Sequence, residues 1–537
     1  MKPMESCTLE YCRRGQRMEH KKLSAGYILV WCGIMAAGAA LLLTGINNES
    51  LWYDESYTGS LVKQSFLGII HITGGDNHPP LYYLALRAFT LVFGNTVFTL
   101  RLFSVIGALA LAALGIGPVR RALGSRAGFI YTVFILAMPI TISMAQEARM
   151  YTWAAFLVTG SALYGYFGWL EGKTKDWILF GLFTAAAAYT HYYALLAAVL
   201  LSVIILAVMI AKKRRLSSFI YTAGAVMLSY IPWLIKLLGA IGRVKGSYWI
   251  PPVTGGVIRQ VFTYPFSNKF FIPVLPALPT IGFVIALVII GLGMATQIRK
   301  RDSGALMAVI AMAVYLLTIV TGIAASWLIR PVLVERYMVP VLGLFIMALA
   351  YGAAGLDRKM APSVFAVLLI LGISGMQIRH TMSNRFNGPM REAVQALEVQ
   401  PGDIFLHTDE HTIGTFSYYY PDHENYYYVA QGNGGFSNFD AFRPNGLIVR
   451  SLDEVPTDQR VWMVYRPGGT DTASVPSWVR TGKLKVEGSP VAFRLPYSWY
   501  GFTVYKAAFA QTGSGAALPG DILTVSRAGD MNGSKDN

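Results

Sequence analysis

Long apolar runs separated by short polar segments fill most of the chain up to about residue 380. A membrane-spanning helix needs about 20 mostly apolar residues. By this measure the pattern predicts about eleven spans, at 26–45, 98–118, 128–146, 151–170, 177–190, 193–211, 217–237, 280–298, 304–326, 337–355 and 361–378. Gly and Pro inside several of these runs are compatible with membrane helices.

One further apolar run, from Pro80 to Gly94, is short and is interrupted by Arg87. If it does not cross the membrane, all the basic clusters between the other runs fall on one face. The positive-inside rule makes that face cytoplasmic, with the N-terminus inside and the segment after about residue 380 outside. We therefore expect 80–94 to be a helix lying at the outer interface.

The pattern changes after about residue 385. The stretches GDIFLHT, NYYYVAQ, RVWMVYR and FTVYKAA are typical of short strands, and MREAVQALEV of an amphipathic helix. Alternating strand and helix signals predict a small α/β domain. The expected organisation is a cytoplasmic segment at 1–25, a transmembrane domain at 26–380, an extracytoplasmic α/β domain at 381–509 and a disordered Gly- and Ser-rich tail at 510–537.

Composition agrees with a polytopic membrane protein. Hydrophobic residues make up 54% of the chain and charged residues only 14%, whereas soluble domains carry about 25% charged residues. The net charge of +16 arises largely from clusters between apolar runs, which indicates membrane loops rather than a nucleic-acid-binding surface. All three cysteines precede residue 33, so no disulfide framework can form in the rest of the chain.

The first predicted outer loop begins with LWYDES, in which Asp54 and Glu55 are adjacent. Trp52 and Tyr53 beside them indicate a position near the bilayer surface. A carboxylate partly withdrawn from water can act as a general base. The plainer interpretation is two solvated loop acids.

The same loop ends with GGDNHPPLYY, which contains Asp76 and His78. The two prolines fix an extended entry into the following helix, and by itself this motif is a weak signal. His78 is either a functional residue or an interfacial histidine at a helix start.

Three more predicted outer turns carry candidate residues. MAQEARMY places Glu147 and Arg149 at a membrane edge, where ionisable groups are costly and are functional candidates, although a structural ion pair is the alternative. The planar guanidinium of Arg149 suits a phosphate group. AYTHYYALL contributes His191 and Tyr192, and VERYMVP contributes Arg336, a second cation.

Histidine and carboxylate side chains on this face could hold a divalent metal such as Mg²⁺ or Mn²⁺. The candidate ligands are Asp76, His78 and His191. Their spacing along the chain does not show whether they meet, so the metal question stays open at this point.

The ordered set LWYDES, HPPLYYLALRAF, RLFSV, SMAQEARMY, THYY and ERYMVP resembles the GT-C superfamily of membrane glycosyltransferases over residues 25–380. The likeness is greatest to the bacterial branch related to protein O-mannosyltransferases and lipid A aminoarabinose transferases. It implies a GT-C-like fold and inverting transfer of a sugar from a polyprenyl-phosphate donor on the outer face of a bacterial cell membrane. It also implies that Asp54 is the catalytic carboxylate, with Glu55 as the second acid of the motif.

The resemblance further implies that outer acids, histidines and arginines bind the donor phosphate or a metal. His78, Glu147, Arg149, His191, Tyr192 and Arg336 are the matching positions. One departure is that Asn77-His78 stands where aminoarabinose transferases have Glu-Lys before the prolines, and this puts a metal site in doubt. The WWD motif of oligosaccharyltransferases is absent.

Expected partners are therefore a polyprenyl-phosphate sugar, membrane lipid, and an envelope glycan, lipid or protein acceptor, with no nucleic acid. The alternative function is a polytopic transporter or flippase of lipid-linked or envelope components. A transporter would carry ionisable residues near the middle of its spans, whereas here they gather at the outer ends. Convergence of the candidate residues on one site would favour the enzyme.

Overall fold

The computed structural model describes residues 24–76, 78–243, 250, 252–267, 276–299, 302, 304–356, 372, 389–429, 439–466, 478, 481–494 and 501–509. The chain divides into two compact units. A helical unit contains the residues up to Ile46 and Thr73–Met382, and a C-terminal unit contains Asn47–Ile72 and the residues from Ser383 onward. The predicted tail at 510–537, and the predicted span at 361–378 apart from residue 372, lie outside the described residues.

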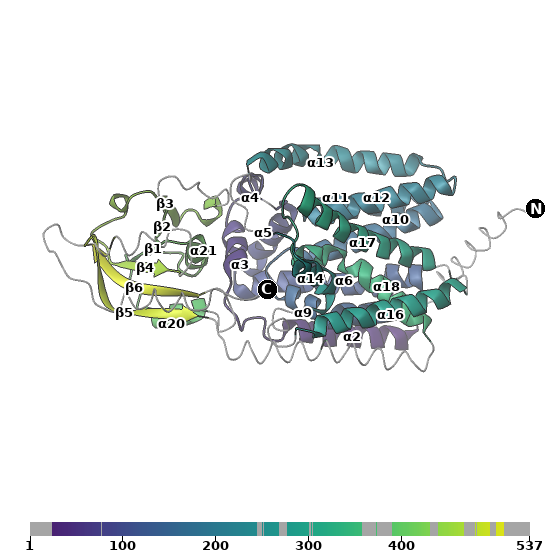
Figure 1. Cartoon of the computed structure of the whole chain (residues 1–537), viewed down its shortest axis with the longest axis horizontal. Helices are drawn as coiled ribbons and strands as arrows, with labels where there is room; N and C mark the ends of the chain where they lie inside the picture. The colour runs from purple at the N-terminus through teal and green to yellow at the C-terminus, as the bar shows by residue number, and fades with distance from the viewer. Residues whose placement is uncertain are drawn as a thin grey trace, which may run out of the picture. The chain divides into compact units, whose positions relative to one another are not determined.

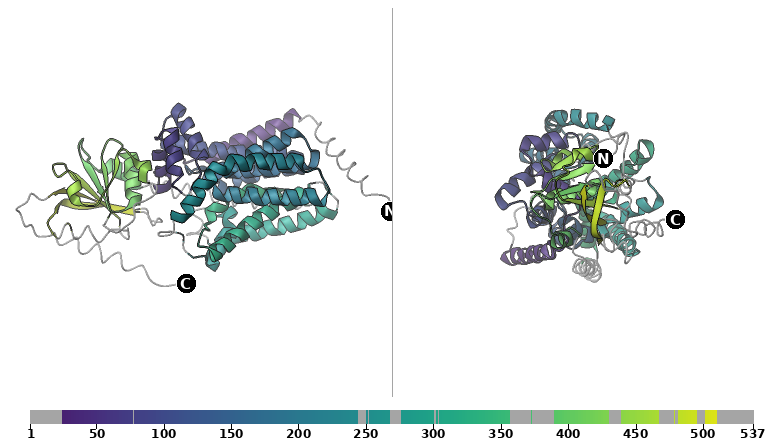
Figure 2. Two further views of the ribbon diagram at one scale, coloured as in Figure 1. Left: turned by 90° about the horizontal axis from the view of Figure 1, so that it is seen from above. Right: turned by 90° about the vertical axis from the view of Figure 1, so that its left-hand side faces the viewer.

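Helices build the helical unit, and the long ones run side by side (Figures 1 and 2). They are α2 (Ala25–Leu43), α5 (Leu81–Phe93), α6 (Val97–Ala113), α7 (Arg120–Leu123), α8 (Ser125–Ala137), α9 (Pro139–Ala145), α10 (Tyr151–Glu171), α11 (Thr174–Ala188), α12 (Tyr192–Ala211), α13 (Ser217–Arg243), α14 (Gly255–Thr263), α16 (Leu278–Arg299), α17 (Ala305–Leu328) and α18 (Leu342–Gly355). A π-helical turn, Gly115–Val119, and two 3₁₀ segments, Tyr264–Phe266 and Glu335–Val341, connect some of them.

Within the described residues, seven helices are long and apolar enough to cross a membrane, or up to eight if α8 and α9 form one bent span. The bend of 58° falls at Pro139, which lacks an N–H and cannot continue the hydrogen-bond ladder of α8. The predicted total of about eleven spans is not confirmed. Helices α10 and α11 occupy predicted spans 151–170 and 177–190, but they are not among these seven.

The apolar run at 80–94 forms helix α5 of 13 residues, which Gly94 ends with a φ of 80°. A membrane-crossing helix needs about 20 residues, so this helix is too short to span, as its sequence indicated. Its position at the membrane surface stays a prediction.

Charged residues mark the two ends of α10. At its C-terminal end, Arg121 pairs with Glu171 and Asp176. At its N-terminal end lies the turn that carries Arg149. A helix of 21 residues is about 30 Å long, close to the thickness of the hydrocarbon core. Arg149 and the Arg121–Glu171–Asp176 group therefore lie at opposite ends of a helix long enough to cross a membrane.

A six-stranded sheet forms the centre of the C-terminal unit, in the order β3-β2-β1-β4-β6-β5 (Figure 1). Its strands are β1 (Ile404–His407), β2 (Asn425–Tyr428), β3 (Gly446–Val449), β4 (Val461–Tyr465), β5 (Leu484–Arg494) and β6 (Gly501–Phe509). The first four are parallel, and β6 pairs antiparallel with β4 and β5. Strands β1, β2, β4 and β6 fall where the sequence predicted them, whereas β3 and β5 were not predicted.

Alternating side chains give the sheet two buried faces. Phe405 of β1 faces a cluster that includes Met390 of α20 (Pro389–Ala396) and Phe416 of α21 (Glu410–Tyr419). Its neighbours Ile404 and Leu406 face a second cluster of buried side chains on the other side of the sheet, which includes Trp478. Both faces are buried, as a domain of two packed layers requires.

The C-terminal unit also includes α3 (Tyr53–Leu61) and most of α4 (Phe66–Thr73). The sequence assigned residues 47–72 to the transmembrane domain at 26–380. In the structure the backbone N–H of Leu51 donates to the hydroxyl of Tyr419 at 2.8 Å, and Gln64 donates to the carbonyl of Arg443 at 2.7 Å. Hydrogen bonds to residues far along the chain thus help to hold this segment in the C-terminal unit.

Candidate functional site

Arg149 is the centre of a polar cluster in the helical unit. It follows α9 and precedes α10, and it is only 3% exposed. Its guanidinium donates to the hydroxyl of Tyr83 at 3.2 Å and lies 2.9 Å from Nε2 of His78. Its backbone carbonyl accepts a hydrogen bond from Ser104 at 3.1 Å. A buried arginine held at both ends has a defined orientation and keeps its charge.

His78 joins Arg149 to an acidic side chain. Its Nδ1 lies 3.6 Å from Oδ2 of Asp76, which is 4% exposed. The prolines after His78 lead into α5, and the backbone N–H of Leu81 there donates to the carbonyl of Tyr189 at 3.0 Å. This bond connects the His78 loop to the turn that carries His191.

His191 caps the N-terminus of α12, where its Nδ1 accepts the backbone N–H of Tyr193 at 3.1 Å. Its ring lies against Tyr151 and Tyr337, with centroid distances of 5.7 and 5.5 Å. Burial lowers the pKa of His191 well below its ordinary value, and the charges of His78, Arg149 and Arg336 lower it further. His191 is therefore a neutral imidazole at physiological pH, within electrostatic range of those three side chains.

The segment 332–337 packs against the α12 side of this cluster. Tyr193 donates from its hydroxyl to the carbonyl of Val332 at 2.8 Å. Arg336 follows in the 3₁₀ segment, with its guanidinium carbon 5.9 Å from the ring centroid of Tyr337. Tyr192 on α12 lies within electrostatic range of Asp76.

The structure thus brings together five of the predicted site residues in the helical unit: Asp76, His78, Arg149, His191 and Arg336. Glu147 shares the turn of Arg149, and its carbonyl accepts the N–H of Arg149 at 2.7 Å. Three tyrosines that sequence reasoning missed, Tyr83, Tyr151 and Tyr337, also line the cluster. Each stands inside or beside a candidate motif, which was the available signal, but tyrosines near a membrane surface are commonly interface anchors.

The cluster does not suit a divalent metal. Among the residues that the structure describes, no group of three His, Cys, Asp or Glu side chains could hold one. The guanidinium of Arg149 also lies against Nε2 of His78, and a guanidinium can only donate hydrogen bonds. That contact occupies the nitrogen lone pair that a metal would need and places a positive charge beside it. An anion fits this environment better.

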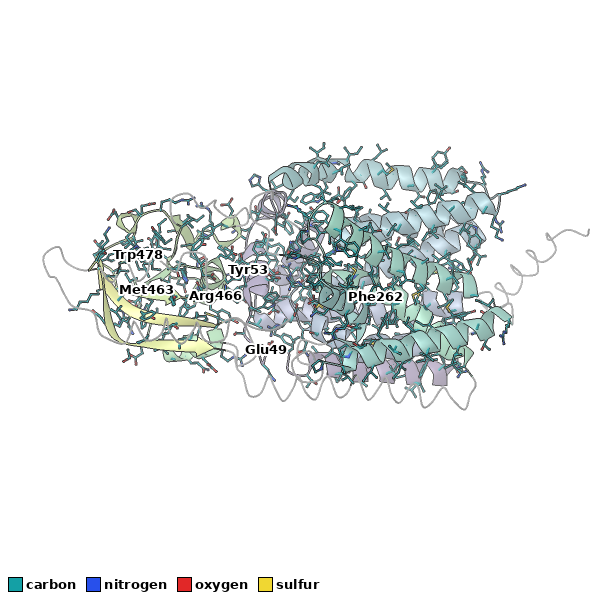
Figure 3. The ribbon with its side chains drawn as sticks, in the orientation of Figure 1. Glu49, Tyr53, Phe262, Met463, Arg466 and Trp478 are labelled. Carbon is teal, nitrogen blue, oxygen red and sulfur yellow. The ribbon has the colours of Figure 1, made fainter. Side chains whose placement is uncertain are left out.

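Asp54 and Glu55 belong to the C-terminal unit. They lie in the first turn of α3, where the helix dipole favours negative charge. Glu55 is 1% exposed and Asp54 is half-buried. The backbone carbonyl of Asp54 accepts the hydroxyl of Thr58 at 2.9 Å. The ring of Tyr53, labelled in Figure 3, packs on His411 of α21 with a centroid distance of 4.7 Å.

Comparison with known proteins gives a partial match to one family model and one shared fold. The family model for dolichyl-phosphate-mannose-protein mannosyltransferases matches residues 77–236, a segment that contains His78, Arg149 and His191. The crystal structure of ArnT from Cupriavidus metallidurans in the apo state has a TM-score of 0.59 at 13% identity, covering 90% of this chain and 98% of that one. ArnT bound to undecaprenyl phosphate has a TM-score of 0.57 at 14% identity, with the same coverage.

The oligosaccharyltransferase AglB from Archaeoglobus fulgidus, in complex with an inhibitory peptide and a dolichol-phosphate, has a TM-score of 0.42 at 10% identity, covering 74% of this chain and 64% of that one. No curated protein matches the chain. The matched segment contains three of the five predicted residues of the polar cluster around Arg149, whereas Asp76 and Arg336 lie outside it, and the fold shared with ArnT extends over nearly the whole chain. The chain therefore shares the fold of ArnT, part of it matches the mannosyltransferase family model, and its long apolar helices indicate a multi-pass membrane protein.

Proposed function

We propose that this protein transfers a sugar from a polyprenyl-phosphate donor to a hydroxyl group of a cell-envelope glycan, lipid or protein. The observation that carries the proposal is the buried guanidinium of Arg149, held between Tyr83 and His78 at one end of α10. Because α10 is about as long as a membrane is thick, an arginine at its end can lie at the membrane surface. Its guanidinium is suited there to the phosphate of a lipid-linked donor. The distribution of basic residues supports an orientation with the N-terminus inside and the C-terminal domain outside, and the resemblance to bacterial glycosyltransferases supports a bacterial cell membrane as the location.

Donor binding in this proposal uses Arg149 and Arg336 as cations, with His78 and the neutral His191 as hydrogen-bonding groups. Tyr192, which follows His191, and Glu147, which shares the turn of Arg149, contact the sugar or the acceptor in this proposal. The complex of ArnT with undecaprenyl phosphate supports a polyprenyl phosphate as the lipid. No step in the proposal requires a metal, since the cluster favours an anion.

Transfer is a single displacement. The acceptor oxygen forms a bond to the anomeric carbon while the bond from that carbon to the phosphate oxygen breaks, and polyprenyl phosphate leaves. Asp54 takes the proton of the acceptor hydroxyl as general base. One displacement inverts the anomeric configuration. The arginines stabilise the negative charge that develops on the departing phosphate, and Glu55 assists by holding or tuning Asp54.

The test is incubation of the purified full-length protein with a panel of polyprenyl-phosphate sugars in lipid nanodiscs, followed by measurement of released polyprenyl phosphate. We expect release with one donor class and its loss in the Asp54→Asn variant. Absence of release with every donor, from protein that shows a cooperative thermal transition, would overturn the proposal. Equal release from the wild type and Asp54→Asn would overturn the role of Asp54.

A further inference from the structure

The helix that carries Asp54 and Glu55 is attached to the C-terminal unit along its whole length. Before α3, the N–H of Leu51 donates to Tyr419 at the end of α21. After α3, Gln64 donates to the carbonyls of Ala441 and Arg443. Within α3, Tyr57 packs edge-on against Phe442 with a centroid distance of 6.0 Å. The orientation of the acidic pair therefore depends on residues more than 300 positions away in the chain.

Tyr53, directly before Asp54, makes the closest of these ring contacts, with His411. A hydrogen-bonded group holds that imidazole. Its Nδ1 lies 3.1 Å from Oδ1 of Asp409 and 3.0 Å from a guanidinium nitrogen of Arg466. The same nitrogen of Arg466 lies 3.1 and 3.3 Å from the two oxygens of Asp409. Asp409 also caps α21 by accepting the backbone N–H of His411 at 3.0 Å.

Gly414 lets the tyrosine approach the helix. A Cβ at this position would lie 2.8 Å from two ring carbons of Tyr53 and 3.0 Å from Phe442. A Cβ atom does not approach a non-bonded carbon as closely as 2.8 Å in folded proteins. The ring of Tyr53 thus sits directly on the backbone of α21, where only glycine leaves room for it.

The Asp409–His411–Arg466 group occupies a particular place in the sheet. Asp409 follows β1 and Arg466 follows β4, and these two strands are parallel neighbours. The chain passes from β1 to β2 on one side and returns to β4 on the other. Carboxyl ends of strands at such a switch point are where open α/β sheets place functional groups. Figure 3 labels Arg466 and Tyr53 within this unit.

We propose that the C-terminal unit sets the position of the Asp54–Glu55 pair for sugar transfer, with Asp409, His411 and Arg466 as positioning residues that act through Tyr53. This inference rests on the proposed function of Asp54. It assigns a catalytic purpose to the extracytoplasmic domain: the sheet and α21 hold α3 in one orientation.

Glu410 supports this assignment. It begins α21 between Asp409 and His411, and burial is the main cause that raises its pKa to about 7. The charges of Asp409 and Asp54 raise this pKa as well, while those of His411 and Arg466 lower it. The charge of Asp54 therefore acts on the start of α21, which agrees with α3 and α21 forming one electrostatic unit.

The opposite edge of the sheet offers a matched control. Asp403 and Arg460 stand before β1 and β4 and form the same kind of pair, with Nε of Arg460 2.9 Å from Oδ1 of Asp403. Both pairs are separated by 57 residues, so they link the same two strands in the same register. Arg460→Gln and Arg466→Gln each break a guanidinium–carboxylate pair across β1 and β4, but only Arg466 contacts His411.

The experiment measures hydrogen exchange and steady-state kinetics of the full-length protein. We expect Arg466→Gln to speed exchange in peptides covering Tyr53–Leu61 while peptides of the sheet exchange as in the wild type. Turnover at saturating donor should fall by about 10²-fold, as for a small misplacement of a reacting group, with the donor KM unchanged. Arg466→Lys should restore part of the turnover, and Arg460→Gln should leave both measurements unchanged.

Gly414→Ala provides a second variant in case Arg466→Gln unfolds the domain. Alanine favours the helix by about 1 kcal/mol relative to glycine, so α21 should persist while the added methyl displaces Tyr53. The same gain in exchange of α3 and the same loss of turnover are expected. Unchanged exchange of α3 in both variants, or faster exchange without loss of turnover, would overturn the inference. Hydrogen exchange does not depend on sugar transfer, so a wild type without turnover would refute the proposed function and not the attachment of α3.

Discussion

Arg149 and His78 meet with 2.9 Å between a guanidinium nitrogen and Nε2, although they are 71 residues apart in the chain. Since a guanidinium only donates, Nε2 of His78 accepts. The proton of a neutral imidazole is then on Nδ1, the atom 3.6 Å from Asp76. Asp76 and Arg149 thus lie on opposite sides of the His78 ring, and in the proposed function the guanidinium of Arg149 binds the donor phosphate.

Arg149→Lys tests phosphate binding. Lysine keeps the charge but loses the planar fork and the simultaneous contacts with Tyr83 and His78. Hydrogen bonds to charged groups contribute about 1.5–3 kcal/mol, so we expect the donor KM to rise by about 10- to 100-fold in the release assay. Arg121→Lys, which alters an arginine paired with Glu171 and Asp176 at the other end of α10, is the control and should keep a normal donor KM. Equal effects from both substitutions would make Arg149 a structural residue.

Asp54→Asn tests the general base. The side chains are nearly the same size, so the fold should persist while proton abstraction fails. General-base catalysis contributes about 10²–10⁴-fold, and turnover at saturating donor should fall by at least that factor. Glu55→Gln should cost less, and thermal stability serves as the control for both variants. An active Asp54→Asn together with an inactive Glu55→Gln would exchange the two roles, whereas two active variants would direct attention to Asp76 and Glu147.

The raised pKa of Glu410 predicts that the free energy of unfolding depends on pH. Its folded pKa of about 7 lies above its ordinary value of 4.5, so the folded state retains a proton that the unfolded state releases. Stability from this group is present below about pH 4.5 and is lost as pH rises towards 7. The loss is at most about 3.5 kcal/mol, at about 1.4 kcal/mol per pKa unit.

Glu410→Gln removes this loss. The melting temperature of the full-length variant should exceed that of the wild type at pH 8 and match it at pH 5. Asp458→Asn, at an exposed position of the same unit, is the control and should follow the wild type at both values. A variant that melts with the wild type at pH 8 would mean that the Glu410 carboxyl titrates normally.

Single cysteines in a cysteine-free background test the orientation in the membrane. Lys213 lies in a predicted cytoplasmic cluster and Asp458 in the C-terminal unit, and both are exposed. A membrane-impermeant thiol reagent should label Lys213→Cys only after lysis and Asp458→Cys in intact cells. The reverse pattern would invert the topology and place the proposed reaction on the cytoplasmic face.

Much of the secondary structure was readable from local pattern. The predicted apolar runs are occupied by α2, α5, α6, α8 to α13 and α16 to α18, and β1, β2, β4, β6 and α20 coincide with the predicted motifs, whereas α3, α4, α7 and α14 were not predicted. Other elements were not readable. Strand β5 contains Gly488, Ser489 and Pro490 beside an irregularity of register, and these residues are typical of turns. Helix α21 contains Gly414 and β-branched and aromatic residues, which have low helix propensity.

The sequence by itself determined that this is a polytopic membrane protein with a small α/β domain, and it identified the ionisable residues at predicted membrane edges. It could do so because apolar length and strand alternation are properties of neighbouring residues. Only the tertiary structure decided that Tyr83 and His78 hold Arg149, and that residues 47–72 pack on α21 rather than with the helices that follow them. These contacts join positions from 66 to 368 residues apart, and no local pattern specifies which distant polar or aromatic group will be the partner.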